Sequence, residues 1–240
     1  MTDDPTLAVR IWRGGADGAF RDYSVPRRPA QTVLDVVTHV QRHLDATLAY
    51  RFACRVGMCG SCAMTVNGRA RWTCRTHVDG VAKGDRLEIA PLAHLPIVRD
   101  LVVDMTRFFD KWAQARGAFV PSASRNDPFA VVPPASPARN AIDAAIECIG
   151  CGICYASCDV VGWKPDYLGP AALNRAWTLV NDTRDAAPGE RLRAIATDAG
   201  CHACHTHQSC TERCPKHLAP TASIAGLKRL VARAALKGTL

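Results

Sequence analysis

The chain lacks any long apolar run and any basic signal segment at its start. A membrane-spanning helix needs about 20 consecutive apolar residues, and no stretch of the sequence approaches that length. The N-terminus, Met1-Thr2-Asp3-Asp4, is acidic where a secretory signal would be basic, and no apolar core follows it. We therefore expect the chain to reach a membrane only through other subunits, and to reside where disulfides rarely form.

A recognisable nucleic-acid-binding module is also missing. The formal net charge of +8 favours acidic partners, but the basic residues are scattered along the sequence. The hydrophobic content of 48% is ordinary for a soluble globular protein, and 240 residues suffice for two modest domains. The charge therefore predicts a solvated basic surface.

Cysteine, in contrast, is abundant, and the twelve cysteines form three groups. The first reads C-x4-C-x2-C followed by a fourth cysteine, which is the plant-type spacing for a [2Fe–2S] cluster. The second is a bacterial C-x2-C-x2-C-x3-C run, and the third ends in Cys-Pro. The groups are Cys54, Cys59, Cys62 and Cys74; Cys148, Cys151, Cys154 and Cys158; and Cys201, Cys204, Cys210 and Cys214. In two-cluster ferredoxins the last cysteine of such a run binds the other cluster, so the last two groups form one interleaved unit.

Zinc is the strongest alternative to iron–sulfur clusters, because C-x2-C pairs also bind zinc. Zinc sites, however, use separated pairs of ligands, whereas this chain places three cysteines in one tight turn. The spacing favours iron–sulfur clusters and hence electron transfer. A zinc-bearing nucleic-acid binder is the alternative of a different class, and it predicts a colourless protein where the clusters predict a brown one.

Periodicity predicts a sheet domain for residues 1–104. Leu7, Val9 and Ile11 alternate as in a strand, with a partner strand in residues 20–25. Thr32 caps a helix whose buried stripe is Val33, Val37, Val40 and Leu44. Asn67-Gly68 predicts a hairpin between Ala63-Met64-Thr65-Val66 and Trp72-Thr73-Cys74, and Leu87-Glu88-Ile89 adds a strand. Two hairpins, a crossing helix and a cluster loop predict a ferredoxin-like β-grasp domain.

Residues 105–240 are predicted to form a helical domain around the remaining cysteines. Helices are expected near residues 104–115, 139–147, 170–182, 190–197 and 221–240, with Leu173, Trp177 and Val180 on one face of the third. A proline-rich stretch from Pro121 to Pro137 is either a linker or a long ordered loop. In the last helix Ile224, Leu227, Val231 and Ala235 form an apolar stripe beside a basic flank, which fits a membrane partner or an ordinary surface helix equally.

One plant-type motif followed by an interleaved bacterial-type pair resembles the iron–sulfur subunit of succinate dehydrogenases and fumarate reductases. The resemblance covers essentially the whole chain, and it includes the segments PIVRDLVVDM at residues 96–105, CIGCGICY at 148–155 and GPAA at 169–172. It implies an α+β fold, a plant-type ferredoxin domain followed by an all-α bacterial-ferredoxin-like domain. It also implies three clusters: [2Fe–2S] on Cys54, Cys59, Cys62 and Cys74; [4Fe–4S] on Cys148, Cys151, Cys154 and Cys214; and [3Fe–4S] on Cys158, Cys204 and Cys210.

In that family electrons pass from FAD on a flavoprotein subunit through the three clusters to quinone at a membrane anchor, which in some members carries haem b. The resemblance thus implies a peripheral subunit on the cytoplasmic face of a bacterial inner membrane, or on the equivalent matrix face, with no substrate chemistry of its own. Fumarate reductase, which runs in reverse, and a subunit of another flavoprotein dehydrogenase are the alternatives. Finding a membrane-anchor partner on purification would exclude the second of these alternatives.

Three further residues match family positions. Trp163 and His205 fall where quinone-reducing members place a Trp and a His, and both side chains can donate a hydrogen bond to quinone. The alternative is that Trp163 only packs and that His205 only caps the cluster loop. Lys228 matches a basic position in the last helix, where a cation attracts electrons or an acidic partner.

The chain departs from the family pattern at three positions. Asp159 replaces the proline after Cys158, and an ionised carboxylate there would lower the potential of the adjacent cluster. Cys201 is the twelfth cysteine, with no ligand role implied, and His207 lies between Cys204 and Cys210. A [4Fe–4S] cluster with His207 or Cys201 as fourth ligand is therefore the alternative to [3Fe–4S].

Overall fold

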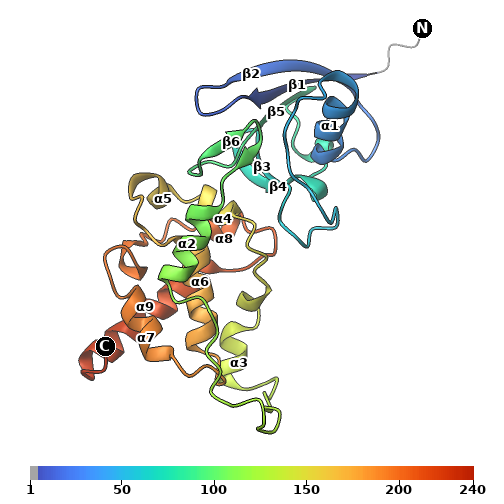
Figure 1. The fold of residues 1–240 in the computed structure, drawn as a ribbon. Coiled ribbons are helices and arrows are strands. Elements are labelled where there is room, and N and C mark those ends of the chain that lie inside the picture. Colours follow the sequence, from blue (N-terminus) through green and yellow to red (C-terminus); the bar gives the residue numbers. More distant parts are fainter. Residues whose placement is uncertain (1–4) are drawn as a thin grey trace. The chain divides into compact units, whose positions relative to one another are not determined.

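The computed structural model describes residues 5–240. The acidic N-terminal segment, residues 1–4, lies outside the described residues. The chain forms two compact units, which are coloured by sequence in Figure 1. The N-terminal unit combines the chain up to Met105 with Ile149–Ser157, and the helical unit combines Thr106–Cys148 with Cys158–Leu240. A short piece of the second cysteine run thus packs with the first unit.

The N-terminal unit is built on a five-stranded mixed sheet with the order β2-β1-β5-β3-β4. Its strands are β1 (Thr6–Arg13), β2 (Ala19–Pro26), β3 (Ala63–Val66), β4 (Arg69–Trp72) and β5 (Arg86–Ala90). β1 pairs in parallel with β5, and the other pairings in this sheet are antiparallel. A separate hairpin joins β6 (Ile97–Arg99) to β7 (Val102–Val103).

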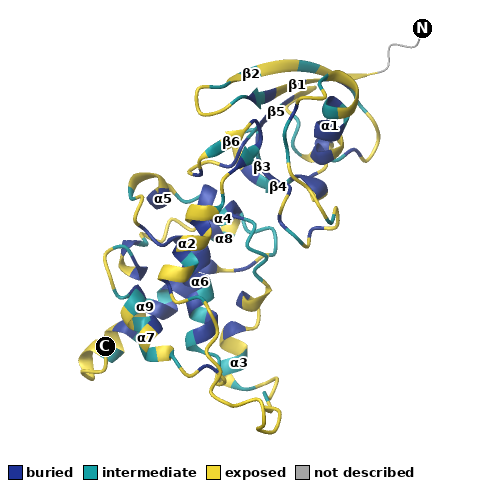
Figure 2. Ribbon diagram, in the orientation of Figure 1, coloured by how far each residue is buried: buried dark blue, intermediate teal, exposed yellow. Residues whose placement is uncertain are grey.

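The core of this unit lies between the sheet and helix α1 (Val33–His39). Alternate residues of β1 face inward, so that Leu7, Val9 and Ile11 are buried while their neighbours are largely exposed, as the sequence predicted. Val33, Val36, Val37 and Val40 of the helical segment pack against them. Figure 2 shows this buried layer in dark blue. One face of each element is therefore removed from water, which is the main driving force for the fold.

The predicted start of α1 is confirmed, and its predicted end is wrong. Thr32 and Asp35 form a reciprocal capping box: Asp35 N donates to Thr32 Oγ1 at 3.2 Å, and Thr32 N donates to Asp35 Oδ2 at 3.0 Å. After His39 the chain widens into a π-type turn over Val40–Leu44, closed by Asp45 N donating to Val40 O. Because such a turn rotates the following residues off the 3.6-residue stripe, Leu44 is 48% exposed.

The hairpin predicted at Asn67-Gly68 is confirmed. Both turn residues have positive φ, 47° and 75°, as a two-residue hairpin turn requires. The returning strand covers Arg69–Trp72, so it begins and ends earlier than the predicted segment at Trp72-Thr73-Cys74. Thr73–Arg75 form a 3₁₀ turn instead, in which Thr73 N and Oγ1 donate to Cys62 O, and this places Cys74 beside the cysteine loop rather than in the sheet.

The helical unit contains seven α-helices and two 3₁₀ turns among its described residues, and α4 (Ile153–Ala156) belongs to the other unit. The α-helices are α2 (Thr106–Gln114), α3 (Pro137–Ile142), α5 (Asp159–Trp163), α6 (Gly169–Val180), α7 (Pro188–Ile195), α8 (Ser209–Glu212) and α9 (Pro220–Leu236), and the 3₁₀ turns cover Ala145–Glu147 and Cys201–Ala203. The predicted α+β class with a helical second part is thus confirmed.

Helix α6 forms the centre of this unit and packs against α2, α7 and α9. Its predicted apolar face is partly wrong: Leu173 is fully buried, but Trp177 and Val180 are only half-buried, while Ala176 and Leu179 are buried. α9 crosses it closely at Gly226, where a Cβ would lie 2.4 Å from the ring of Trp177. The helix is buried on more than one side, so a single stripe underestimates its contacts.

The proline-rich stretch is an ordered loop at its start. Val120 N donates to Asp185 Oδ2 at 3.1 Å, and Ser122 N donates to Arg184 O at 2.8 Å. Asp185 in turn pairs with the fully buried Arg191 at 2.5 Å, and Arg191 also donates to Ala118 O. A buried ion pair therefore fastens this loop to the start of α7.

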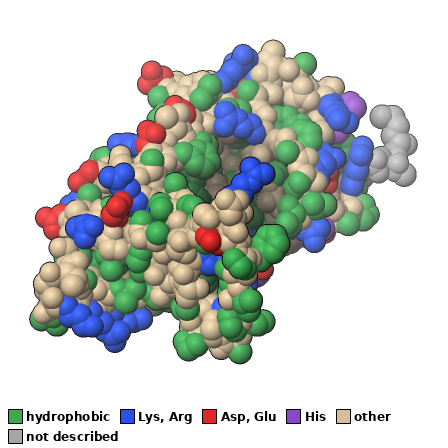
Figure 3. Space-filling view, turned by 60° about the horizontal axis from the view of Figure 1, so that its bottom comes forward, with side chains coloured by type: hydrophobic (Ala, Val, Ile, Leu, Met, Phe, Trp, Pro, Cys, Tyr) green, Lys and Arg blue, Asp and Glu red, His purple; other side chains and the backbone are tan. Residues whose placement is uncertain are grey.

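The apolar stripe predicted for the last helix is confirmed for Ile224, Leu227 and Val231, which are buried in α9, and is wrong for Ala235, which is exposed. Within residues 5–240, no helix has the length and apolar character to cross a membrane. On the face drawn in Figure 3, basic and acidic side chains are interspersed.

Candidate cluster-binding sites

The first cysteine group lies in a loop that wraps around its own sulfur atoms. Gly57 and Gly60 have positive φ, 75° and 72°, which glycine adopts without strain. A Cβ on Gly57 would lie 2.8 Å from the ring of Trp72. The loop is thus held against β4 at a point where only glycine fits.

Backbone N–H groups of this loop point at sulfur. Met58 N and Cys59 N both donate to Cys54 Sγ at 3.3 Å. Hydrogen bonds from Cys54 and Ser61 lower the pKa of the Cys59 thiol to about 6, whereas burial and the neighbouring Cys62 raise the pKa of Cys74 to about 11. The four side chains are close enough to influence one another, and inward N–H donors favour sulfur atoms that carry negative charge.

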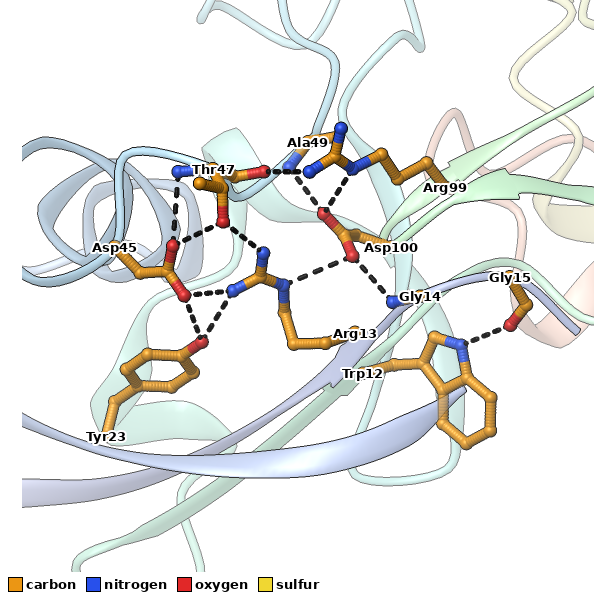
Figure 4. Close-up of polar contacts among 10 residues, drawn as sticks. All are labelled: Trp12, Arg13, Gly14, Gly15, Tyr23, Asp45, Thr47, Ala49, Arg99 and Asp100. Atoms are coloured by element: carbon orange, nitrogen blue, oxygen red, sulfur yellow. Dashed lines mark hydrogen bonds and ion pairs between the residues drawn. The ribbon is translucent and has the colours of Figure 1, made fainter. Parts of the chain in front are cut away.

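A buried charge network that sequence reasoning missed supports the chain leading into this loop (Figure 4). Arg13 at the end of β1 contacts Asp45 and donates to Thr47 Oγ1 at 2.8 Å, and its Nε lies 3.1 Å from Asp100 Oδ1. Asp100 also accepts hydrogen bonds from Gly14 N and Ala49 N at 2.7 and 2.8 Å. Burial alone would raise the pKa of Asp100, but these donors outweigh it and hold the pKa below its usual range.

The second cysteine run is divided between the units. Cys151 and Cys154 lie in the N-terminal unit, and Cys148, Cys158 and Cys214 lie in the helical unit. Gly150 and Gly152 have positive φ on either side of Cys151, which gives the tight turn that the spacing requires. Within the N-terminal unit, Gly60 abuts Cys151: a Cβ on Gly60 would lie 2.5 Å from Cys151 Cβ.

The third group gathers inside the helical unit. Burial raises the pKa of Cys158, and the nearby thiols of Cys210 and Cys204 raise it further. The buried Tyr167 lies beside the same three cysteines, and burial together with their charges raises its pKa far above the usual range. Tertiary folding thus brings Cys158 together with two cysteines more than forty positions later in the chain.

Exposed aromatic residues of the helical unit surround His207. Trp163 is 71% exposed and meets the ring of His207 edge-on, with centroids 5.8 Å apart. The ring of His205 lies 6.1 Å from that of His207, and His207 Nδ1 is 3.4 Å from Asp159 Oδ2. The predicted pair Trp163 and His205 therefore shares a surface site with Asp159 and His207, two of the three residues that depart from the family pattern.

The remaining singled-out residues lie on the inner side of α9. Cys201 is fully buried in a 3₁₀ turn, and burial raises the pKa of its thiol. Lys228 is half-buried and donates from Nζ to Cys204 O at 2.7 Å. Lys228 thus anchors the segment that carries the third cysteine group.

The donor set fits iron–sulfur clusters in its chemistry. Thiolates are soft ligands suited to iron, and the first loop adds backbone N–H donors aimed at the Cys54 sulfur. Among residues 5–240, no three His, Cys, Asp or Glu side chains are grouped so as to hold a single metal ion.

Comparison with known proteins agrees with this arrangement. Residues 8–110 match a family described as a 2Fe-2S iron-sulfur cluster binding domain, and residues 144–218 match a 4Fe-4S dicluster domain. The chain is 37% identical to the succinate dehydrogenase iron-sulfur subunit of Paracoccus denitrificans, over 83% of this chain and 76% of that protein. It is 34% identical to a fumarate reductase iron-sulfur subunit of Mycobacterium tuberculosis, over 100% of this chain and 98% of that protein.

A solved structure shares the fold. It is the Mycobacterium smegmatis Sdh1 complex in the apo form, in which one chain matches with a TM-score of 0.85 and 28% identity, covering 95% of this chain and 96% of that one. A [2Fe–2S]-binding domain followed by a [4Fe–4S] dicluster domain, at this identity over most of the length, is sufficient to assign the family. The chain is an electron-transfer protein of the family of succinate dehydrogenase and fumarate reductase iron–sulfur subunits.

Proposed function

We propose that this chain is the iron–sulfur subunit of a succinate:quinone oxidoreductase. In this proposal it passes electrons from FAD on a flavoprotein subunit through [2Fe–2S], [4Fe–4S] and [3Fe–4S] clusters to quinone. The proposed ligands are Cys54, Cys59, Cys62 and Cys74 for the first cluster; Cys148, Cys151, Cys154 and Cys214 for the second; and Cys158, Cys204 and Cys210 for the third. Residues 1–104 would form the first carrier domain and residues 105–240 the second.

The contact between Gly60 and Cys151 carries this proposal. Gly60 belongs to the first cysteine loop, and Cys151 is a proposed ligand of the second cluster. The two residues are so close that a Cβ on Gly60 would lie 2.5 Å from Cys151 Cβ. Two cofactor-binding segments in direct backbone contact suit electron transfer, for which separation is the controlling variable. A single-cluster or zinc-binding role gives no reason for such a contact.

The protein's own groups would hold and tune the cofactors. Bound clusters supply one-electron redox chemistry. Met58 N and Cys59 N would stabilise negative charge on the Cys54 sulfur. Because a reduced cluster carries more negative charge than an oxidised one, these donors would favour the reduced state and raise the cluster's potential. At the third site, burial raises the pKa of the Cys158 and Cys210 thiols. The thiol protons, including that on Cys74, whose pKa is raised to about 11, must leave when metal binds.

Quinone is proposed to bind at the exposed Trp163 and His205. The indole N–H and an imidazole N–H can each donate to a quinone carbonyl, and both residues lie in the unit that carries Cys158 and Cys204. Replacing Trp163 with Phe should raise the KM for quinone several-fold while leaving succinate-dependent reduction of a water-soluble acceptor unchanged. Equal loss of both activities would contradict a quinone-site role.

The proposed partners are a FAD-containing subunit and a membrane anchor, with or without haem b, that hold this chain at the inner face of the membrane. Purification of the native complex tests this directly. We expect a flavoprotein and an anchor to copurify, and succinate-dependent quinone reduction to exceed fumarate-dependent quinol oxidation. A faster reverse reaction would make the complex a fumarate reductase, and the absence of both activities would overturn the proposal.

A further inference from the structure

A basic cavity lies in the N-terminal unit, outside the cysteine sites. Its volume is about 310 Å³, and it is lined by the loop before α1, by α1 and its π-type turn, and by the cysteine loop. The charged and imidazole side chains that line it are Arg28, Asp35, His39, Arg42, His43 and Arg55. Three segments that are separate in the sequence thus place positively charged side chains around one cavity.

Most of this positive charge is not neutralised by the protein. Of the three arginines, only Arg55 has a carboxylate neighbour among the described residues: its Nη2 lies 4.0 Å from Asp35 Oδ1. Arg28 and Arg42 are exposed and form no ion pair with a described carboxylate. Three arginines facing one aspartate leave an excess of positive charge in a concave site, where it acts more strongly than on a flat surface.

Asp35, the carboxylate that lines the cavity, already accepts hydrogen bonds from the N-cap of α1. Asp35 Oδ2 accepts hydrogen bonds from Thr32 N and Thr32 Oγ1 at 3.0 and 2.7 Å in the capping box of α1. Thr38, the hydroxyl that lines the cavity, donates to Leu34 O at 2.8 Å. Asp35 and Thr38 are therefore held by the helix, and the arginines and histidines are the groups left to bind a ligand.

We propose that this cavity binds a small dianion, a phosphate or sulfate group, free or on a small molecule. Arginine presents a planar fork of N–H donors that matches the oxygens of such a group. The rings of His39 and His43 lie 4.7 Å apart and can add two further donors. A hollow of only about 310 Å³ fits a compact ion better than a flat protein surface or an extended nucleic acid. The cluster and quinone functions leave these residues unused.

The histidines make binding depend on pH. Burial lowers the pKa of His39, and the neighbouring His43 and Arg28 lower it further. A bound dianion counteracts the two charge effects and favours protonated His39, so binding takes up protons. The other charged or titratable groups that face His39 in the cavity are Arg28, Asp35, Arg42, His43 and Arg55. Sulfate, which does not titrate in this range, should therefore bind more tightly at pH 6 than at pH 8.

Calorimetric titration of the cluster-loaded full-length chain with inorganic phosphate and with sulfate tests the proposal. We expect saturable binding that is weakened about tenfold in Arg42→Gln and in Arg28→Gln, because each removes a charge-assisted hydrogen bond. Arg21→Gln removes an equal charge from an exposed position on β2 and should change the affinity less than about twofold. Unchanged cluster absorption would show that each variant is folded.

Glycerol phosphate, titrated in parallel, identifies the source of the group. Tighter binding than inorganic phosphate supports an esterified phosphate, and weaker binding supports the free ion. The proposal is overturned if binding does not saturate, or if Arg21→Gln weakens it as much as Arg42→Gln.

Discussion

The two units place their cysteines in opposite ways. In the N-terminal unit, four cysteines lie between positions 54 and 74, in one loop and the 3₁₀ turn that follows the hairpin. In the helical unit, α6 and α7 separate Cys158 from Cys204 and Cys210 in the sequence, and only the packing of the unit brings the three cysteines together. The first site is therefore local and depends on turns, whereas the third depends on long-range packing.

Removing a cysteine from the long-range site gives the largest expected effect. Cys210→Ser should abolish the [3Fe–4S] signal in the electron paramagnetic resonance spectrum of the oxidised protein, since three ligands leave none to spare. The [2Fe–2S] signal should persist, because its ligands lie in the other unit. Cys201→Ser is the matched control, a buried cysteine of the same unit outside the proposed set. Loss of the signal in the control instead would reassign the ligands.

Breaking the buried ion pair of the helical unit should destabilise that unit. Arg191→Leu leaves Asp185 as an unpaired buried charge and should lower the free energy of unfolding by about 3–5 kcal/mol. Urea unfolding followed by helical circular dichroism measures this. Arg184→Leu breaks an exposed pair with Asp182 nearby and should cost less than about 1 kcal/mol. Similar costs for the two variants would show that Arg191 is not essential to the packing.

The local site should be sensitive to backbone geometry. Gly60→Ala combines positive φ with a Cβ placed 2.5 Å from Cys151, so it should cost roughly 2–4 kcal/mol. Gly68→Ala has a similar φ but open space around its Cβ, and should cost about 1 kcal/mol. Thermal unfolding of both variants separates the contact from the backbone strain. If the two melt alike, Gly60 does not need its close approach to Cys151.

The smallest effect is expected at the helix cap that precedes the local site. Thr32→Ala removes the side-chain acceptor for Asp35 N and should cost about 1 kcal/mol. Thr32→Ser keeps that oxygen and should remain within a few tenths of wild type. Chemical unfolding measures both, and equal destabilisation by Ser and Ala would mean that the methyl group, not the cap, matters.

The elements predicted correctly are those determined by neighbouring residues. Strand alternation at Leu7, Val9 and Ile11, the Thr32 cap and the Asn67-Gly68 turn all act over a few positions. The errors occur where tertiary contacts override the local pattern. Leu44 lies in a π-type turn and so does not continue the buried stripe of α1. Thr73 lies in a 3₁₀ turn instead of the predicted strand, and its hydroxyl donates to Cys62 O.

The sequence alone determined the class of cofactor, because cysteine spacing is a local property that few other sites share. It also determined the family, through motifs spread along the whole chain. Only the tertiary structure placed Arg13 between Asp45 and Asp100, Arg191 beside Asp185, and Gly60 against Cys151. Buried charge pairs and close backbone contacts join residues that are distant in sequence, and no periodicity records which partners will meet.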